Sequence, residues 1–414
     1  MTKRKIKMNR KRSISIKAFL TLALTIAMCL GSLTTAFAAG EITGSEAAPA
    51  QAAITKVLQM PEGTVTPTSG FTFTVTSVSV DGIAATTTNM PVIAGQTLNF
   101  TSADTGTATS GIKSITKETP NIFASVTWPH AGEYVYNITE TAGSASGMTY
   151  SSAIYKMTVY VRNGVTNPTV PYIHAIGTEI TAADNGTQTV GAKVDPTPGT
   201  GHGILFTNTY IETPAIVDPG TGDMLSISKT VAGDYGNRTR YFPFSVTLNK
   251  AQLVTGTPVY KAYVMEGTAI VTSTDNSSAV QPADTYGPYI NVTAGTPLTI
   301  NLKHGQKLAF IGMPVGTTYT VTEAAAIDYT PSASVVVNGA APAATNGTEN
   351  TALTIGSPTA IILGPNANSA AFTNTYKTVT PTGIALDSLP FIMIIVLAVG
   401  AFAAFIVVKS RRRA

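Results

Sequence analysis

Short segments in which apolar and polar residues alternate run through the chain between residues 40 and 377. The alternation has a period of two at 71–76, 155–162 and 242–248, and Gly, Pro and Asn residues separate such segments. This period puts successive side chains on opposite faces of an extended strand. Many short strands with turn residues between them are typical of β-sandwiches. The pattern predicts an all-β fold, and the region is too long for one such domain and sufficient for two.

An internal repeat divides this region into two halves. The sequence Phe-Thr-Asn-Thr-Tyr at 206–210 recurs at 372–376, and Thr-Glu at 139–140 is echoed at 322–323. An earlier predicted strand in each half contains a lysine. We expect the seam near 213–222, where Pro and Gly cluster. Both halves carry Lys, Glu and Asn in the same order, as Lys56, Glu140 and Asn208 and then as Lys229, Glu323 and Asn374.

These six polar residues share the parity of apolar neighbours on their strands. Lys56, for example, aligns with Ile54 and Leu58. Because residues two apart face the same side of a sheet, all six are expected in the core, where they would be costly unless they meet one another. Burial favours a neutral lysine amine and a protonated glutamate. Such an amine can attack the Asn side-chain carbonyl while the Glu carboxyl relays protons, so that ammonia leaves and an amide crosslink remains.

A more ordinary interpretation is available for each residue alone. The lysines could extend to solvent, the Asn side chains could make turn hydrogen bonds, and each Glu could pair with a surface cation. Two parallel sets of three residues favour the crosslink instead. On this hypothesis Glu140 and Glu323 are the catalysts, and the bonds join Lys56 to Asn208 and Lys229 to Asn374.

The region from about residue 53 to 377 resembles the streptococcal pilin isopeptide-linkage domains. The resemblance is carried by the repeated Phe-Thr-Asn-Thr-Tyr motif and the Thr-Glu before it. It implies two tandem immunoglobulin-like domains of the collagen-adhesin B type, in which a Lys on the first strand bonds an Asn on the last and a Glu between them in sequence is the catalyst. The second half looks like a related but separate branch found in similar surface proteins.

The N-terminal residues predict export. Eight of the first seventeen residues are basic, and an apolar run from Ala18 to Leu30 follows them. This is the pattern of a secretory signal peptide. Ala-Phe-Ala at 36–38 indicates cleavage after Ala38 or Ala39. The alternative is an uncleaved membrane anchor, for which the apolar run is short.

A second apolar run, Leu389 to Val408, has about the length that a bilayer core needs. Lys409, Arg411, Arg412 and Arg413 follow it. Basic residues after a span stay on the cytoplasmic side, so the preceding chain is expected outside the cell.

A short Pro/Thr/Gly motif precedes the predicted span. The motif is Val379-Thr380-Pro381-Thr382-Gly383. With the span and basic tail it resembles a sortase substrate, although the common Leu-Pro-x-Thr-Gly form has proline second; proline in third place is similar to a variant of streptococcal-type backbone pilins. The resemblance implies cleavage between Thr382 and Gly383, whereas the alternative is a plain linker before a permanent anchor.

The predicted organisation follows from these signals. In chain order it is signal peptide 1–39, linker 40–52, first domain 53–212, linker 213–222, second domain 223–377, sorting region 378–388, membrane span 389–408 and cytoplasmic tail 409–414.

Charge, cysteine content and the absence of cofactor motifs in the sequence argue against several classes of function. Between residues 40 and 387 the chain has 14 basic and 22 acidic residues, a net charge of −8, which argues against nucleic-acid binding. The one cysteine, Cys29, lies in the signal's apolar run, so no disulfide can join the mature domains. The four histidines are scattered, and no metal-ligand spacing or other cofactor motif is present. We therefore expect no metal, no cofactor and no enzyme acting on another molecule.

The remaining candidates are a pilin-like subunit and a single anchored adhesin. Both would be extracellular; the pilin would be processed by a sortase into the cell wall or a pilus, and the adhesin would be anchored in the wall or the membrane. The pilin would join copies of itself or other pilins, and the adhesin would bind a host ligand through long loops such as Asp81–Lys113 or Gly267–Pro288. The Tyr-Pro-Lys acceptor motif of many backbone pilins is absent. Lys193 is the candidate acceptor, and its alternative role is a solvated loop charge.

Overall fold

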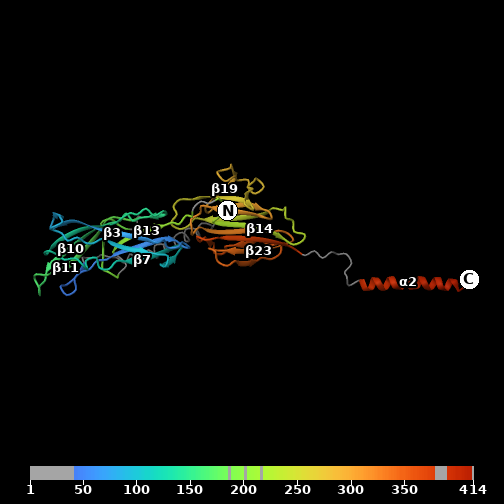
Figure 1. Cartoon of the computed structure of the whole chain (residues 1–414), viewed down its shortest axis with the longest axis horizontal. Helices are drawn as coiled ribbons and strands as arrows, with labels where there is room; N and C mark the ends of the chain where they lie inside the picture. Colours follow the sequence, from blue (N-terminus) through green and yellow to red (C-terminus); the bar gives the residue numbers. More distant parts are fainter. Residues whose placement is uncertain (1–41, 185–187, 200–202, 215–217, 378–388, 413–414) are drawn as a thin grey trace, which may run out of the picture.

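The computed structural model describes residues 42–184, 188–199, 203–214, 218–377 and 389–412. The expected signal peptide and the sorting motif Val379–Gly383 lie outside these ranges. The described chain forms two pairs of β-sheets placed end to end, followed by the helix α2 (Leu389–Arg411) (Figure 1). The predicted all-β fold is confirmed.

The first pair combines an eight-stranded and a five-stranded sheet. The larger sheet has the order β1-β11-β10-β8-β3-β4, with β12 on β11 and β5 on β3, and the smaller has the order β6-β7-β2-β13-β9. The larger sheet contains β1 (Ile42–Thr43), β3 (Ser69–Val80), β4 (Ile83–Ala84), β5 (Gln96–Phe100), β8 (Gly132–Glu140), β10 (Ile154–Asn163), β11 (Pro171–Ala182) and β12 (Lys193–Val194). The smaller contains β2 (Ile54–Pro61), β6 (Thr107–Thr109), β7 (Ile112–Glu118), β9 (Met148–Thr149) and β13 (Ile204–Tyr210).

The second pair combines a nine-stranded and a five-stranded sheet. The larger has the order β18-β19-β16-β21-β14-β27-β23-β24 with β17 on β16, and the smaller has β20-β15-β22-β25 with β26 on β22. The larger sheet contains β14 (Leu225–Ala232), β16 (Val259–Glu266), β17 (Ala269–Ile270), β18 (Val280–Gln281), β19 (Tyr289–Thr293), β21 (Gln306–Ile311), β23 (Tyr329–Val336), β24 (Ala343–Asn346) and β27 (Ser369–Tyr376). The smaller contains β15 (Phe242–Asn249), β20 (Leu298–Leu302), β22 (Thr318–Glu323), β25 (Leu353–Ile355) and β26 (Ile361–Ile362).

Alternation in the sequence matches burial along the strands. The segments predicted from 71–76, 155–162 and 242–248 lie in β3, β10 and β15, respectively, so these predictions are confirmed. Along β15 every second residue from Phe242 to Leu248 is buried. The buried face of β15 packs in the second core between the two sheets, as expected for a sandwich.

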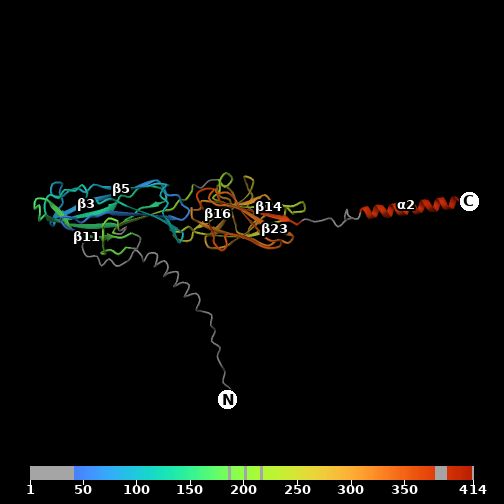
Figure 2. The same ribbon diagram turned by 90° about the horizontal axis from the view of Figure 1, so that it is seen from below.

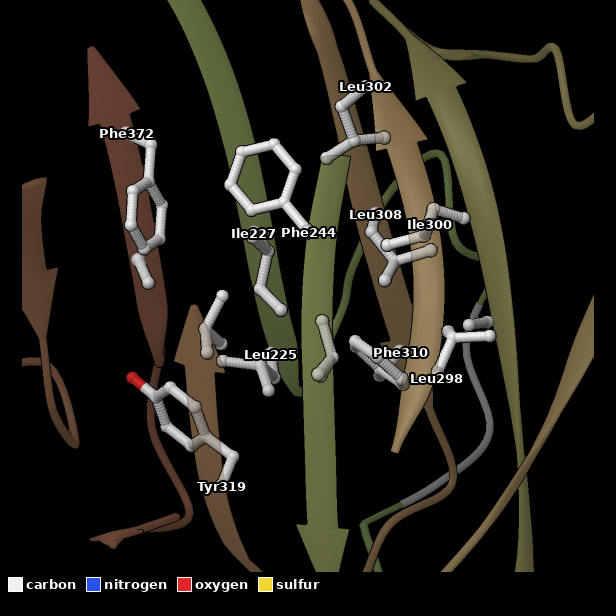
Figure 3. Packing of buried hydrophobic residues seen from close by; sticks show 14 of the residues in the cluster. Leu225, Ile227, Phe244, Leu298, Ile300, Leu302, Leu308, Phe310, Tyr319 and Phe372 are labelled. Carbon is white, nitrogen blue, oxygen red and sulfur yellow. The ribbon is translucent and has the colours of Figure 1, made fainter. Parts of the chain in front are cut away.

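Each sheet pair encloses its own apolar core. The first core includes Phe73 and Tyr136, and the second includes Phe244 and Phe310. Figure 3 shows side chains of the second core from β14, β21 and β27 pointing toward those of β15, β20 and β22. We propose that the two sheet pairs are the two domains expected from the repeat. They meet directly, because the Val315 N–H in the second donates to the Glu212 carbonyl in the first at 2.9 Å.

The expected long loops are shorter than the sequence suggested. The segment 81–113 contains β4, β5 and β6, and the segment 267–288 contains β17 and β18. In the second segment, Asn276 is fully buried and donates to the Asn301 carbonyl at 2.9 Å. These strands are two to five residues long, so the sequence contains too few alternating positions to reveal them. The view in Figure 2 shows the same two sheet pairs from below.

The helix α2 is long and apolar enough to cross a membrane. It continues past the predicted end at Val408 to Arg411, with Lys409 and Arg411 in its last turn. Basic side chains there are favourable, because the helix C-terminus carries partial negative charge. Its described side chains are exposed, so neither domain core depends on it.

Candidate functional site

Parallel pairing of the first and last core strands of each domain brings the predicted Lys and Asn together. In the first domain β2 and β13 are parallel neighbours, with Lys56 opposite Phe206 and Asn208 opposite Leu58. Because the two residues face the same side two positions apart, their side chains are diagonal neighbours. The second domain repeats this arrangement between β14 and β27, where Lys229 is opposite Phe372.

The predicted glutamates come from the facing sheets. Glu140 is the last residue of β8, and Glu323 is the last residue of β22. Each therefore reaches across the sandwich to the Lys and Asn of the opposite sheet. All six predicted residues are buried, with no more than 8% of any of them exposed, as their parity predicted.

One carboxylate holds both reacting groups in the first site. Lys56 Nζ lies 2.6 Å from Glu140 Oε2, and Asn208 Nδ2 donates to Glu140 Oε1 at 2.6 Å. The Ser151 N–H donates to Asn208 Oδ1 at 2.7 Å. Glu140 thus brings the amine and the amide together, and the amide carbonyl has a separate donor.

The second site has the same three groups with fewer hydrogen bonds. Lys229 Nζ lies 2.7 Å from Glu323 Oε1, and Asn374 Nδ2 donates to the same oxygen at 2.8 Å. Among the described residues, neither Glu323 Oε2 nor Asn374 Oδ1 has a hydrogen-bond partner. The Lys229 contact is an ion pair without hydrogen-bond geometry.

Burial shifts the pKa values of both ion pairs toward neutral forms. Loss of water lowers the pKa of Lys56 to about 8, against the opposing attraction of Glu140, and lowers the pKa of Lys229 to about 8 against that of Glu323. Burial likewise raises the pKa of Glu140 and of Glu323. These directions favour a neutral amine beside a protonated acid, because desolvation penalises the charged form of each group.

Aromatic rings complete the dry surroundings of each lysine. Lys56 Nζ lies 4.7 Å from the centre of the Phe71 ring, and Lys229 Nζ lies 4.4 Å from that of Phe242. Both rings are almost fully buried. The amines are therefore excluded from water and remain close to one carboxylate.

Sequence reasoning missed Ser151 and Asp184. Asp184 is 2% exposed and accepts from the Ser151 hydroxyl at 2.6 and 2.8 Å. Asp184 precedes Asn-Gly in the sequence, and this combination is typical of a turn rather than of a reactive site. Their proximity depends on how β9 and β11 are placed in space, which periodicity does not reveal.

The remaining predicted residues are those of the sorting motif and the candidate acceptor Lys193. The sorting residues Val379, Thr380, Pro381, Thr382 and Gly383 lie outside the described residues. Lys193 is exposed on β12, opposite Glu179 of β11. It is accessible on the outside of the first domain.

Family models match both halves of the chain. Residues 52–211 match the Spy0128-like isopeptide containing domain, and residues 223–376 match a domain of unknown function (DUF7601). A pilin of Streptococcus pyogenes serotype M1 is 26% identical over 398 residues, covering 92% of this chain and 97% of the pilin.

Two solved structures of Streptococcus pyogenes proteins are also similar. The major pilin is 21% identical with a TM-score of 0.32, covering 79% of this chain and 99% of that one. The major pilin T-13 is 18% identical with a TM-score of 0.31, covering 82% of this chain and 100% of that one. The first domain thus matches the Spy0128-like isopeptide containing domain and the chain is similar to a streptococcal pilin, which confirms the resemblance that its motifs had indicated.

Proposed function

We propose that the chain is a sortase-processed, pilin-like subunit of a Gram-positive cell surface, and that each domain forms a Lys–Asn isopeptide bond within itself. The observation that carries this proposal is the contact of Lys56 Nζ and Asn208 Nδ2 with the two oxygens of one buried carboxylate. Such a cluster would be a costly way to stabilise a core, because buried ion pairs rarely repay their desolvation. It suits a reaction that consumes both polar groups.

The proposed reaction balances without a cofactor. A proton passes from Lys56 to Glu140, leaving a neutral amine and a carboxylic acid. The amine attacks Asn208 Cγ, and the acid gives its proton to Nδ2, which leaves as ammonia when the Cγ–Nδ2 bond breaks. The carboxylate then takes the proton that Nζ must lose, so Glu140 ends protonated. The reaction occurs once in each domain, because it consumes both the amine and the amide. Lys229, Glu323 and Asn374 follow the same steps.

The intact mass of the folded chain tests the proposal. Residues 40–377, which contain both cores, should weigh less than their sequence by two ammonias. Proteolysis should yield peptides linked through Lys56 to Asn208 and through Lys229 to Asn374. An unchanged mass in folded protein would refute the reaction in both domains, and loss of one ammonia would confine it to the domain whose linked peptide is recovered.

The rate of crosslinking should pass through a maximum with pH. The reactive pair shares one proton, and burial lowers the pKa of Lys56 to about 8 while raising the pKa of Glu140. Above about pH 8 the pair loses this proton and no acid remains for the leaving group, whereas at low pH both groups are protonated and the amine is charged. Refolding unreacted chains between about pH 5 and about pH 10, with acid quenching, measures this profile. A rate that climbs steadily to the alkaline limit would show that the acid is not needed.

Surface attachment is the second part of the proposal. It is supported by an apolar helix, α2, after the second domain, and by similarity to a pilin along most of the chain. Sortase would cleave between Thr382 and Gly383 and join Thr382 to a lysine of another subunit. Lys193, exposed on the first domain, is the proposed acceptor.

A further inference from the structure

We infer that the Ser151 N–H stabilises the negative charge that develops on Asn208 Oδ1, and that Asp184 is the positioning residue that holds this donor in place. The inference rests on the isopeptide reaction proposed above. It adds to that reaction a hydrogen-bond donor for the Asn carbonyl oxygen, which the Lys–Glu–Asn set does not supply. Attack on Asn208 Cγ moves electrons onto Oδ1. A fixed donor on that oxygen stabilises the tetrahedral intermediate more than the ground state.

The donor comes from the segment that joins the two sheets. Ser151 follows β9, which pairs with β13 next to Asn208, and residues 151–153 then lead into β10 of the facing sheet. The Ser151 N–H is 2.7 Å from Asn208 Oδ1, and Ser151 is buried. Its position therefore depends on how this crossing segment is fixed.

Asp184 fixes the segment at several atoms. Its Oδ1 accepts from the Ser152 N–H at 2.9 Å and the Ala153 N–H at 3.0 Å, and both its oxygens accept from the Ser151 hydroxyl. Its Oδ2 also accepts from the Thr207 N–H at 3.1 Å. Because Thr207 immediately precedes Asn208, one carboxylate holds both the donor segment and the strand that carries the amide. Its charge is shared among these donors.

The second domain lacks this arrangement. Asn374 Oδ1 is buried without a hydrogen-bond partner among the described residues. The residue opposite Asn374 on the neighbouring strand β23 is Pro331, which has no N–H to donate. The structure thus contains a matched pair of sites, one with the carbonyl donor and one without it.

The test is to time the two bonds separately in one molecule. Unreacted chains of residues 40–377 are unfolded in urea, refolded by dilution, quenched in acid and mapped for linked peptides. Fluorescence of Trp128, the chain's one tryptophan and part of the first core, reports folding of that domain. We expect the Lys56–Asn208 bond to form roughly 10-fold or more faster than the Lys229–Asn374 bond, as one well-placed hydrogen bond allows.

Asp184→Asn should slow the first bond by roughly 10-fold, because an amide cannot accept from all the donors that the carboxylate holds, and should leave the second bond unchanged. Ser151→Ala, which keeps the N–H but loses the hydroxyl contact, should slow it less and provides a milder variant if Asp184→Asn does not fold. Ile180→Val is the control, since it removes a core methylene from β11 without touching Ser151. It should leave the crosslinking rate after folding unchanged.

A spectroscopic readout separates positioning from stability. In a Glu140→Ala background that does not react, the ¹³Cγ resonance of Asn208 should shift when Asp184→Asn is added, because the hydrogen bond to Oδ1 weakens. An unchanged resonance, or an unchanged rate of the first bond in Asp184→Asn, would overturn the inference. Failure of the wild-type chain to form either bond would instead refute the proposed reaction, so the two failures are distinct.

Discussion

Replacing Glu140 by Ala is expected to abolish the Lys56–Asn208 bond and to leave the Lys229–Asn374 bond intact. The two domains have separate cores and separate glutamates, so each failure should be local. The purified variant should retain one ammonia that the wild type loses. Its first domain should still fold, because the apolar faces of its strands are unchanged, but it should melt earlier and become open to proteases.

The expected loss of stability is large. Each bond would close a loop of about 150 residues, and if disulfide loop entropy is a fair guide, the closure stabilises the domain by about 5 kcal/mol. Removal of Glu140 also leaves the buried Lys56 amine without its ion-pair partner, which adds to the cost. Calorimetry of the two-domain protein should show the first transition at a lower temperature and the second unmoved.

Two matched variants separate the effect of the lost crosslink from the effect of the lost side chain of Glu140. Glu140→Gln keeps the shape of the side chain but cannot relay protons, so it should also block the first bond while preserving more of the packing. Glu323→Ala should give the mirror result, with the second bond lost and the first retained. If either Ala variant lost both ammonias at the wild-type rate, Glu would not be the catalyst in that domain.

Much of the fold was predictable because alternate residues of a strand face the core and the solvent, so the sequence alternates between apolar and polar residues. The segments at 71–76 and 242–248 became β3 and β15, and the same parity placed Lys56 and Asn208 in the core. Parity alone does not show which buried polar residues act as one set. The repeat does, because Lys, Glu and Asn recur in the same order in both halves. Short-range pattern thus predicted the strands and the burial of the residues on which the proposed chemistry depends.

What the sequence did not contain is the arrangement between distant strands. The parallel pairing of β2 with β13 and the reach of Glu140 from the facing sheet are set by topology. The contact of Asp184 with Ser151 joins residues at two separate strand ends and has no periodic signal. The same limit explains the segment 81–113, which was expected as a loop and carries three short strands.

Assembly outside the cell should depend on the sorting motif. In the native host, mature protein should occur in the wall fraction with Thr382 as its C-terminal residue or joined through it to another subunit. Because the described side chains of α2 are exposed, its removal should cost no domain stability. Deleting the sortase, or replacing Thr382 by Ala, should leave intact chains in the membrane through their apolar helix.

The acceptor can be tested in the same extracts. If the chain polymerises, wild-type wall extracts should show a ladder of high molecular weight, and Lys193→Ala should collapse it to a single species. Lys156→Ala is the matched control, because Lys156 is also exposed on a strand of the first domain.

A single wall-bound species in the wild type, with affinity for a host protein, would favour the anchored adhesin. Chains ending at Ala414 and found only in membranes, whether or not sortase is present, would contradict sorting altogether. Since the proposed crosslinks lie within each domain, their ammonia losses should persist in every one of these sorting variants. That persistence would separate a failure of assembly from a failure of the proposed chemistry.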